Sequence, residues 1–478
     1  MDNVPLYVFK KIMKKNFFYE IKDKRVISRK CSNKVIKKRI KYENLYIHDF
    51  CNDKNIIINS FKNKVLIVPK ILLNDRDYIS ADLFEHLETP VKDNKEIFEN
   101  IVKNDTREAS NYITFIIAIT YTCNLHCSYC YQQNDKNLDK KLISKENLEK
   151  ILDIIMLFKQ ENPQKIIEIG LFGGEPLLPQ NSDIINKVLS FCVENKIKIH
   201  ITTNGVYLRY FFKTLVIHRN LISSINTTID SVKENYITRC SDKQNLAKET
   251  GSSMLEAIKL LLQYKVPVNV ATNIDSHNVL FIKNIHDYFV ENGFFDYSNF
   301  RWDIGRVDDR LYETNYSKII SETEILSELL ILKDSKYNFH AAFMRSIQVL
   351  SKKIGLDFNV SEQRGVYNYC WASSAVDEVF YIDSDLDVFR CTCTVGRKRF
   401  SLFKFSLENL NKFKLHNRTY LDYNDCIKCK IGGFCSGGCK LSFDVDKEKQ
   451  CEYEKRNFDS FIENIFIPHV KKLGKGYF

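Results

Sequence analysis

Strand-type and helix-type segments alternate regularly between residues 113 and 307. Residues 113–120 form a mostly apolar run, which is typical of a strand that is buried on both faces. Strands that alternate with helices of roughly 10–15 residues indicate parallel βαβ units. About six such units predict an α/β fold, namely a partial (β/α)6 barrel that does not close fully. The expected strands are 113–120, 166–172, 198–203, 222–229, 267–274 and 300–307, and the expected helices are 144–160, 182–194, 252–264 and 279–292.

The length of 478 residues suggests about three structural units. A hydrophobic content of 44% with 27% charged residues is typical of a globular protein. No apolar run reaches the roughly 18–20 residues of a membrane-spanning helix, and the N-terminus has no pattern of a secretory signal. We therefore expect a cytoplasmic protein with no membrane partner.

The net charge of +11 has two interpretations. It could attract an acidic partner, such as a nucleic acid or an acidic peptide. Alternatively, it reflects the abundance of lysine along the whole chain, since only 22–41 is a strongly basic stretch. We favour the second interpretation, and nucleic acid is the less favoured partner.

Fifteen cysteines are unevenly distributed along the chain. Three fall between residues 123 and 130, and eight fall between 370 and 451. In a cytoplasmic chain, clustered cysteines indicate metal binding or redox chemistry rather than disulfides. The scattered cysteines are expected to be small buried hydrophobic residues, and they are Cys31, Cys51, Cys192 and Cys240.

The first cysteine cluster immediately follows the first strand of the barrel. Its spacing is Cys123-x3-Cys127-x2-Cys130. Three thiolates this close can hold three irons of a [4Fe–4S] cluster, so that the fourth iron is free to bind a substrate or cofactor. A structural zinc site and three core cysteines are the alternative interpretations.

With Tyr129 before its third cysteine, this loop resembles the signature of the radical S-adenosylmethionine (SAM) superfamily. The resemblance implies a radical SAM barrel, in which the open iron binds the amino and carboxylate groups of SAM. It also implies that one electron cleaves SAM to methionine and a 5′-deoxyadenosyl radical, which abstracts hydrogen from the substrate.

Other motifs follow the later strands, and chemistry in parallel α/β folds is found at these carboxyl ends. Gly173-Gly174-Glu175 follows the second strand, where glycines allow close approach and a carboxylate can hold an ammonium group. The resemblance implies that this segment binds the amino group of SAM, although a tight turn would use the same residues. A second turn, 203–205, follows the third strand. Residues 228–231 and Arg239 lie where similar enzymes contact the SAM ribose and carboxylate, although the family usually has Ser at 228 and Gly at 231. The expected SAM-binding residues are Gly173, Gly174, Glu175, Asn204, Thr228, Asp230 and Arg239.

The C-terminal cysteines have the spacing Cys426-x2-Cys429-x5-Cys435-x3-Cys439, followed by Cys451. Alone, this pattern is compatible with a zinc ribbon. Beside the radical SAM motifs it resembles the SPASM domain, a module of seven cysteines that binds two auxiliary [4Fe–4S] clusters. The expected total is therefore three clusters.

The family's pairing assigns these cysteines to two auxiliary clusters. The outer cluster would be held by Cys426, Cys429, Cys435 and Cys451. The inner cluster would have Cys370, Cys391 and Cys439, which leaves one iron open unless Cys393 binds it. The family's glycine before the second cysteine is replaced here by Leu386.

Asp383, Asp385 and Asp387 imitate the start of a calcium-binding loop. An EF-hand also needs Gly at position six and Glu at position twelve, where this chain has Val388 and Thr394. We reject calcium and predict the tip of a hairpin.

Proteins of the resembled architecture mostly modify ribosomally made peptides or proteins. They form cross-links such as thioethers, or they oxidise a side chain to formylglycine. The formylglycine subgroup has an Asp where this chain has Thr392, which counts against that reaction. The implied partners are a precursor peptide and an electron donor such as ferredoxin or flavodoxin. The alternatives are a formylglycine maturase, a radical SAM enzyme acting on a small molecule, and a zinc-stabilised nucleic-acid-binding protein.

The expected domain organisation has four parts. Residues 1–105 are an α+β region with strands near 56–58 and 65–69 and a helix at 81–87. This region is a candidate for leader-peptide recognition, although a structural lid is an equal alternative. The other parts are a radical SAM core at 110–335, a SPASM domain at 365–460 and a C-terminal tail at 461–478.

Overall fold

A computed structural model describes residues 17–475 in two compact units. Unit 1 comprises Met1–Thr106, Ala341–Tyr369 and Thr419–Phe478, and unit 2 comprises Arg107–His340 and Cys370–Arg418. The predicted site residues Arg239 and Cys370 lie outside the described residues. Within 17–475, the structure does not describe residues 32–33, 38–43, 52, 74–77, 89–93, 95, 97–110, 233–243, 310, 314–315, 333–335, 340–344, 357–371, 373–377, 415–423 and 436–437.

Unit 2 is built on an open ten-stranded sheet with the order β14-β13-β12-β11-β10-β9-β8-β15-β16-β17. Neighbouring strands from β8 to β14 pair in parallel. This confirms the expected α/β fold with an incompletely closed parallel barrel. The strands are β8 (Tyr112–Thr120), β9 (Ile166–Gly173), β10 (Lys198–Thr202), β11 (Ile222–Thr228), β12 (Val268–Ile274), β13 (Phe300–Arg306) and β14 (Asn338–Phe339).

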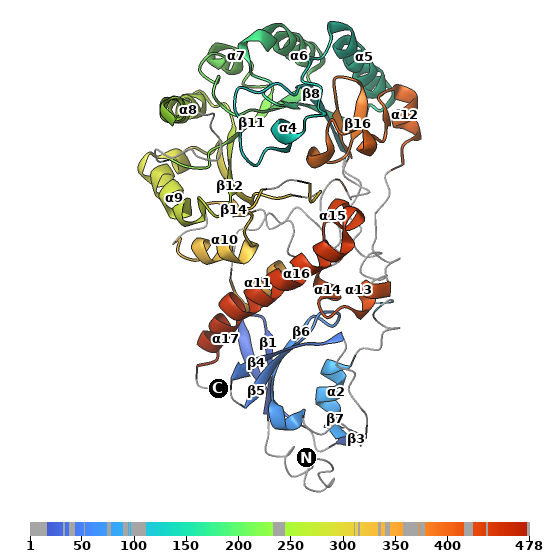
Figure 1. Ribbon diagram of the computed structural model, residues 1–478, viewed down its shortest axis with the longest axis vertical. Helices are drawn as coiled ribbons and strands as arrows, with labels where there is room; N and C mark the ends of the chain where they lie inside the picture. Colours follow the sequence, from blue (N-terminus) through green and yellow to red (C-terminus); the bar gives the residue numbers. More distant parts are fainter. Residues whose placement is uncertain are drawn as a thin grey trace. The chain divides into compact units, whose positions relative to one another are not determined.

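Helices connect these strands, and Figure 1 shows α5 to α9 in an arc around them with α4 inside the arc. The Ser144 side chain caps α5 by accepting a hydrogen bond from the Asn147 N–H. Two boundaries differ from the expectation by three residues or more. Helix α8 begins eight residues early, since it tolerates Gly251 in its interior, and 279–281 is a 3-10 turn. The helices are α4 (Tyr131–Asn134), α5 (Lys145–Glu161), α6 (Ser182–Asn195), α7 (Phe212–Ile217), α8 (Gln244–Gln263), α9 (Ile282–Glu291) and α10 (Glu322–Leu329).

Residues from the predicted SPASM region extend the barrel sheet. Strand β15 (Glu378–Ile382) pairs in parallel with β8, and the antiparallel strands β16 (Asp387–Phe389) and β17 (Phe403–Lys404) follow it. The β15–β16 connection confirms the predicted hairpin tip at Asp383–Asp387. Leu386 adopts a φ of 66° in this turn, a conformation that favours glycine.

Aromatic packing fixes this extension to the barrel. The ring of Phe115 on β8 lies 5.7 Å from that of Phe158 on α5 and 6.2 Å from that of Phe380 on β15. A second buried cluster joins β8, β15 and β16 and the loop that follows, and it consists of Ile116, Ala118, Tyr121, Tyr381, Phe389 and Val395. Helix α12 (Leu407–Lys412) completes unit 2.

Unit 1 contains an antiparallel sheet with the order β2-β1-β6-β5-β4. Strands β5 and β6 and helix α2 confirm the elements expected in the N-terminal region. Helix α16 packs on this sheet through Phe458, whose ring lies 4.8 Å from that of Tyr46. No helix in the described residues is long and apolar enough to cross a membrane. The strands are β1 (Phe17–Lys22), β2 (Arg25–Lys30), β3 (Val35–Lys37), β4 (Tyr46–Cys51), β5 (Lys54–Asn59), β6 (Lys64–Pro69) and β7 (Tyr78–Ser80), and the helices are α2 (Ala81–Leu87), α11 (Arg345–Ile354), α13 (Asn424–Lys428), α14 (Gly432–Cys435), α15 (Lys440–Val445), α16 (Lys447–Phe461) and α17 (Ile467–Leu473).

Candidate functional site

The three-cysteine loop leaves the carboxyl end of β8 and leads into α4. Cys123, Cys127 and Cys130 form no disulfide, and each is partly exposed. The Cys130 N–H donates to the carbonyl of Cys127 at 3.0 Å, which folds the second half of the loop into a turn. Burial raises the pKa of the Cys123 thiol, and the nearby Cys130 raises it further. These thiols therefore lie near each other on one short loop.

Gly173 and Gly174, at the end of β9, lie directly against the start of this loop. The Gly174 N–H donates to the Thr120 carbonyl at 2.7 Å, and the Glu175 N–H donates to the Thr122 carbonyl at 2.9 Å. A Cβ on Gly173 would lie 2.1 Å from the Thr120 oxygen, and one on Gly174 would lie 2.4 Å from the Thr122 oxygen. Both positions therefore require glycine, because the chain's own backbone approaches them closely.

The Glu175 carboxylate is fully buried and connects β9 to β10. It accepts hydrogen bonds from the Leu177 N–H at 2.7 Å, the Thr203 hydroxyl at 2.7 Å and the Asn204 N–H at 2.5 Å. The Asn204 side-chain amide in turn donates to Asn124 Oδ1 at 2.7 Å and contacts Cys123 Sγ at 3.5 Å. Glu175 thereby positions Asn204 against the cysteine loop.

Asp230 connects the same loop to the ends of β11 and β12. It is buried, and its carboxylate accepts hydrogen bonds from the Tyr129 hydroxyl at 2.5 Å and from the Asn273 N–H at 2.8 Å. Thr228, the last residue of β11, is partly exposed. The structure thus brings Glu175, Asn204 and Asp230 together around the loop that contains Cys123–Cys130.

Two further residues of this network were not among the predicted site residues. Asp275 is fully buried and accepts hydrogen bonds from the His277 N–H at 2.8 Å and from the Tyr316 hydroxyl. The Tyr316 ring lies 6.4 Å from the Tyr129 ring, and burial together with Asp275 raises the pKa of Tyr316. Asp275 could have been found from its place after a strand. Tyr316 lies in an aperiodic loop that gives no such signal.

In unit 1, four C-terminal cysteines line one cavity of about 80 Å³. They come from α13, α14, α16 and the turn after α13, and they are the four expected at the outer auxiliary cluster: Cys426, Cys429, Cys435 and Cys451. Burial raises the pKa of Cys426 to about 12, and the neighbouring thiols of Cys451 and Cys429 contribute to the rise. A Cβ on Gly432 would lie 2.1 Å from the Cys426 carbonyl, so glycine allows this turn to close.

The cysteines expected at the inner cluster are divided between the two units. Cys391 and Cys393 follow β16 in unit 2, and Cys439 is buried before α15 in unit 1. The Thr392 carbonyl accepts a hydrogen bond from the Tyr131 hydroxyl at 2.5 Å, which connects this segment to α4. The inner ligand set stays a prediction.

The donors at both cysteine sites fit iron–sulfur clusters. Each set consists of thiols, and [4Fe–4S] clusters are held by cysteine thiolates. Among the described residues, no three His, Cys, Asp or Glu side chains converge as a single metal ion requires. In an iron–sulfur cluster each cysteine binds a different iron. The cysteine sulfurs therefore do not converge on one metal atom, as the ligands of a single ion do.

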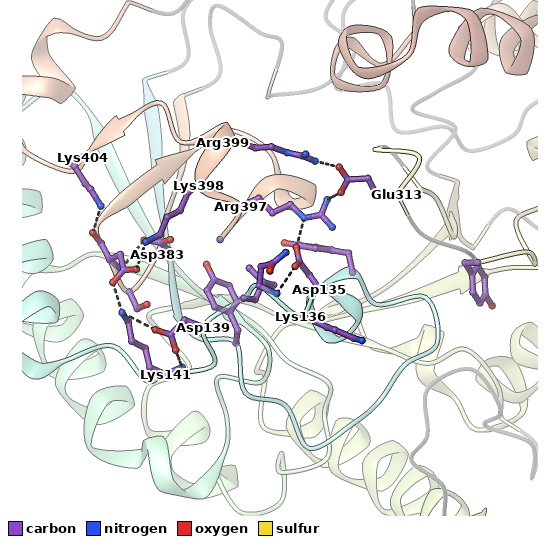
Figure 2. Close-up of a pocket in the computed structure, with 18 of the residues that line it drawn as sticks. Asp135, Lys136, Asp139, Lys141, Glu313, Asp383, Arg397, Lys398, Arg399 and Lys404 are labelled. Atoms are coloured by element: carbon purple, nitrogen blue, oxygen red, sulfur yellow. Dashed lines mark hydrogen bonds and ion pairs between the residues drawn. The ribbon is translucent and has the colours of Figure 1, made fainter.

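A second, larger cavity of about 1430 Å³ lies in unit 2 beside the cysteine loop. Ser128 and Tyr131 of the loop and α4 line it, and so do Tyr316 and the β15–β16 turn. Its other walls are strongly charged, as Figure 2 shows. A space of this size exceeds the roughly 300–1,000 Å³ typical of small-molecule pockets.

Residues 117–287 match the family model of the radical SAM superfamily. Over 366 residues, the chain is 22% identical to the cysteine-type anaerobic sulfatase-maturating enzyme of Clostridium perfringens, covering 72% of this chain and 93% of that enzyme. It is 24% identical over 217 residues to the GTP 3′,8-cyclase of Staphylococcus epidermidis, covering 44% of this chain. The chain spans less than two thirds of the length of several curated relatives, 59% for this cyclase.

A solved structure supports the fold. Native anSMEcpe with bound AdoMet and Cp18Cys peptide is similar to this chain with a TM-score of 0.54 and 20% identity. The similarity covers 76% of this chain and 99% of that chain. At this level of identity it establishes the shared fold.

Proposed function

Since residues 117–287 form a radical SAM domain, we propose that this chain is a maturase that uses SAM to modify a ribosomally made peptide or protein. When bound, the cluster supplies the electron that cleaves SAM to methionine and a 5′-deoxyadenosyl radical, which takes a hydrogen atom from the substrate. One observation carries the proposal. The N–H groups of Gly174 and Glu175 hold the segment that leads into the predicted cluster loop, and Asn204, which is bound to Glu175, contacts Cys123 in the loop itself. All three residues come from the motifs expected at the SAM site.

The chain's own residues would divide the work at this site. Cys123, Cys127 and Cys130 would hold the cluster. From the sequence, Glu175 is expected to bind the amino group of SAM. Because its buried carboxylate already accepts three hydrogen bonds, we propose that it also positions Asn204 and the loop. The SAM-binding surface would be formed by the backbone of Gly173 and Gly174 and by the side chains of Asn204, Thr228, Asp230 and Arg239.

The cavity lined by four thiols in unit 1 supports an auxiliary cluster at Cys426, Cys429, Cys435 and Cys451. Cys370, Cys391 and Cys439 would hold the inner cluster. An inner cluster with three cysteines has an iron that could bind a substrate thiolate. This favours a cysteine-containing peptide and a cross-link such as a thioether.

Three observations support a peptide substrate. One relative is named a sulfatase-maturating enzyme, and the anSMEcpe structure contains a Cp18Cys peptide. The cavity of about 1430 Å³ beside the loop is large enough for several residues of a peptide. Residues 1–105 would then bind a leader peptide, and a ferredoxin or flavodoxin would supply electrons.

A second candidate function is radical SAM chemistry on a small molecule. The similarity to a GTP 3′,8-cyclase favours it, although that match covers only 44% of this chain. Thr392 counts against formylglycine formation, because the resembled subgroup has an Asp there.

The test is anaerobic reconstitution followed by counting iron and sulfide. At four irons per cluster, the wild type should hold about twelve irons and the variant Cys123→Ala/Cys127→Ala/Cys130→Ala about eight. Only the wild type should form 5′-deoxyadenosine from SAM with a chemical reductant. Zinc in place of iron, or SAM cleavage by the triple variant, would return the chain to the zinc-stabilised binding protein.

The substrate class needs a second measurement. A precursor peptide encoded beside this chain's gene should change in mass when incubated with the reconstituted protein, SAM and reduced flavodoxin. Cleavage of SAM without any change in the peptide, but with turnover of a nucleotide, would favour the small-molecule candidate.

A further inference from the structure

The charged side chains of the large cavity form two groups, which Figure 2 shows at opposite sides of the view. The first, the hairpin group, surrounds the β15–β16 turn. It consists of Asp139, Lys141, Asp383, Asp385, Lys398 and Lys404, which line the cavity, together with Asp387, which belongs to the same polar network but not to the cavity wall. The second, the arginine group, consists of Asp135, Lys136, Glu313, Arg397 and Arg399.

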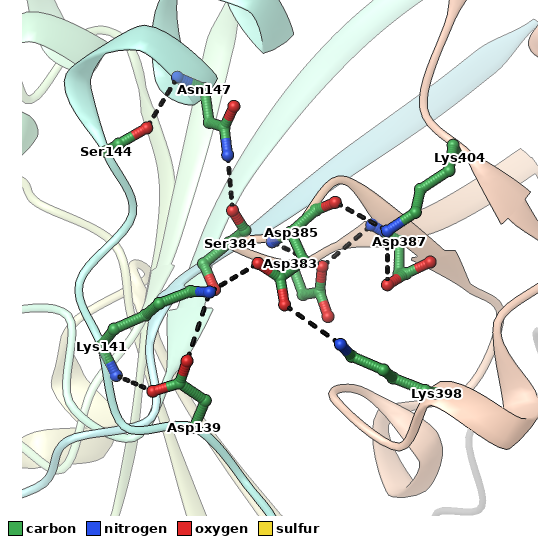
Figure 3. A network of polar contacts seen from close by, with 10 residues as sticks. All are labelled: Asp139, Lys141, Ser144, Asn147, Asp383, Ser384, Asp385, Asp387, Lys398 and Lys404. Atoms are coloured by element: carbon green, nitrogen blue, oxygen red, sulfur yellow. Dashed lines mark hydrogen bonds and ion pairs between the residues drawn. The ribbon is translucent and has the colours of Figure 1, made fainter.

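Each lysine of the hairpin group pairs with a carboxylate other than Asp383, as Figure 3 shows. Lys141 Nζ lies 2.6 Å from Asp385 and 3.2 Å from Asp139, and Lys398 Nζ lies 3.7 Å from Asp385. Lys404 Nζ lies 2.9 Å from Asp387. Four carboxylates against three lysines leave this group with one excess negative charge when all are ionised.

Asp383 is 3% exposed. Its Oδ1 accepts the N–H groups of Asp385 and Asp387, both at 2.9 Å. Its other oxygen has no hydrogen-bond or ion-pair partner within the part of the chain that the structure describes. Burial raises the pKa of Asp383 to about 6, and the carboxylates of Asp387 and Asp385 contribute to this rise.

Tyr121 supplies a second unsatisfied group in the wall of the same cavity. Tyr121 is 3% exposed, and its hydroxyl has no hydrogen-bond partner among the described residues. A buried hydroxyl without a partner destabilises the folded chain, which favours a ligand that supplies one.

We propose that Asp383 and Tyr121 form a binding site for the cationic group of an arginine or lysine side chain in the substrate. The peptide nature of this ligand rests on the proposed function. A carboxylate oxygen and a hydroxyl oxygen both accept hydrogen bonds, and guanidinium and ammonium groups only donate them. The excess negative charge of the hairpin group attracts a cation and repels phosphate or carboxylate ligands.

The arginine group complements this site. Arg397 lies 3.1 Å from both Asp135 and Glu313, and Arg399 pairs with Glu313. Its three cations and two carboxylates leave one excess positive charge. A substrate segment with a basic side chain toward the hairpin group and an acidic side chain toward the arginine group would match both charges.

The test is isothermal titration of the full-length reconstituted protein with small probes. Two probes, N-acetyl-arginine amide and N-acetyl-lysine amide, carry their positive charge on the side chain. Alanine amide carries its positive charge on the α-amine. N-acetyl-citrulline amide is the neutral analogue of the arginine probe. We expect the two side-chain cations to bind at least tenfold more tightly than citrulline amide. Equal binding of citrulline amide would overturn the proposal, and stronger binding of alanine amide would overturn its assignment to a side chain.

Three variants locate the site. Asp383→Asn should weaken the arginine probe at least tenfold, and Tyr121→Phe should weaken it by about threefold. Asp139→Asn is the matched control, because it changes the charge of the same group equally while its carboxylate already pairs with Lys141. A loss in Asp139→Asn equal to that in Asp383→Asn would contradict a specific site.

The wild-type protein alone also tests the proposal, should Asp383→Asn fail to fold. Binding of the arginine probe should weaken as the pH falls through about 6, because Asp383 takes up a proton there. Affinity that is constant between pH 7.5 and 5 would refute the role of Asp383. Probe binding requires no SAM cleavage, so absence of 5′-deoxyadenosine in the wild type would refute the proposed function separately.

Discussion

Replacing Glu175 by glutamine changes one buried carboxylate to an amide of nearly the same shape. Glutamine has one acceptor oxygen, whereas the carboxylate accepts from Leu177, Thr203 and Asn204. If the amide oxygen replaces Oε1, the new NH₂ group faces the Asn204 N–H, and two donors oppose each other. The loss of one hydrogen bond to a charged acceptor costs about 1.5–3 kcal/mol, and the buried donor left unpaired adds about 1–3 kcal/mol.

These terms sum to about 2.5–6 kcal/mol, and a value near the lower end, about 3 kcal/mol, corresponds to roughly a 100-fold shift toward conformations in which Asn204 has left Glu175. Hydrogen exchange at the Asn204 amide should therefore accelerate by about two orders of magnitude. Because the Asn204 side chain contacts Cys123 and Asn124, formation of 5′-deoxyadenosine should fall as well.

The control for this variant is Asp183→Asn, which changes an exposed carboxylate in the first turn of α6. It should leave both measurements unchanged. Unchanged exchange at Asn204 in Glu175→Gln would refute the inference that Glu175 acts by holding this segment.

The other predictions concern the loop and the hairpin turn. Gly174→Ala should lower SAM cleavage about 100-fold. A Cβ at this position would lie 2.4 Å from the Thr122 oxygen, so that carbonyl must retreat by roughly 0.6 Å, and misplacements near 1 Å cost about that factor in rate. The control is Gly305→Ala, which should remain active because a Cβ there meets nothing within 4 Å. Tyr129→Phe removes the hydroxyl that donates a hydrogen bond to Asp230, which leaves that buried carboxylate with one partner fewer. The free energy of unfolding, measured by urea titration, should fall by about 1–3 kcal/mol. An unchanged urea midpoint would contradict this contact. Because the pKa of Asp383 is raised to about 6, the folded chain binds the proton of this carboxyl more tightly than the unfolded chain. The contribution of Asp383 to the free energy of unfolding is therefore largest below about pH 4. It falls by up to about 3 kcal/mol as the pH rises through about 6. Asp383→Asn should remove this pH dependence of the urea midpoint, and an identical slope in both proteins would show that another group causes it.

Several parts of the site were predictable because they depend on residues close together in the chain. The spacing of Cys123, Cys127 and Cys130 places three thiols on one loop whatever the rest of the fold does. The hairpin at Asp383–Asp387 follows similarly from a short polar run between two apolar segments. The sequence did not reveal why Gly173 and Gly174 are needed. We expected a ligand to approach them, and the backbone at Thr120–Thr122 already does so.

The predicted SPASM range 365–460 contributes residues to both compact units. Its cysteine spacing suggested one domain. In the structure, Glu378–Ile382 extends the barrel sheet beside β8, and the residues from Thr419 onward belong to the unit that contains the N-terminal sheet. A cysteine pattern reports which residues share a metal site, but it carries no information on which sheet the intervening strands join.

The sequence by itself determined the alternation of strands and helices and the position of the motifs at strand ends. Both depend on periodicity and spacing along the chain. The tertiary structure decided which side chains meet across long separations. Tyr129 with Asp230 and Lys141 with Asp385 are examples of such pairs. Their proximity depends on the order of strands in the sheet, which local periodicity does not specify. For the same reason, the cavity between the cysteine loop and the hairpin turn exists only in the folded chain.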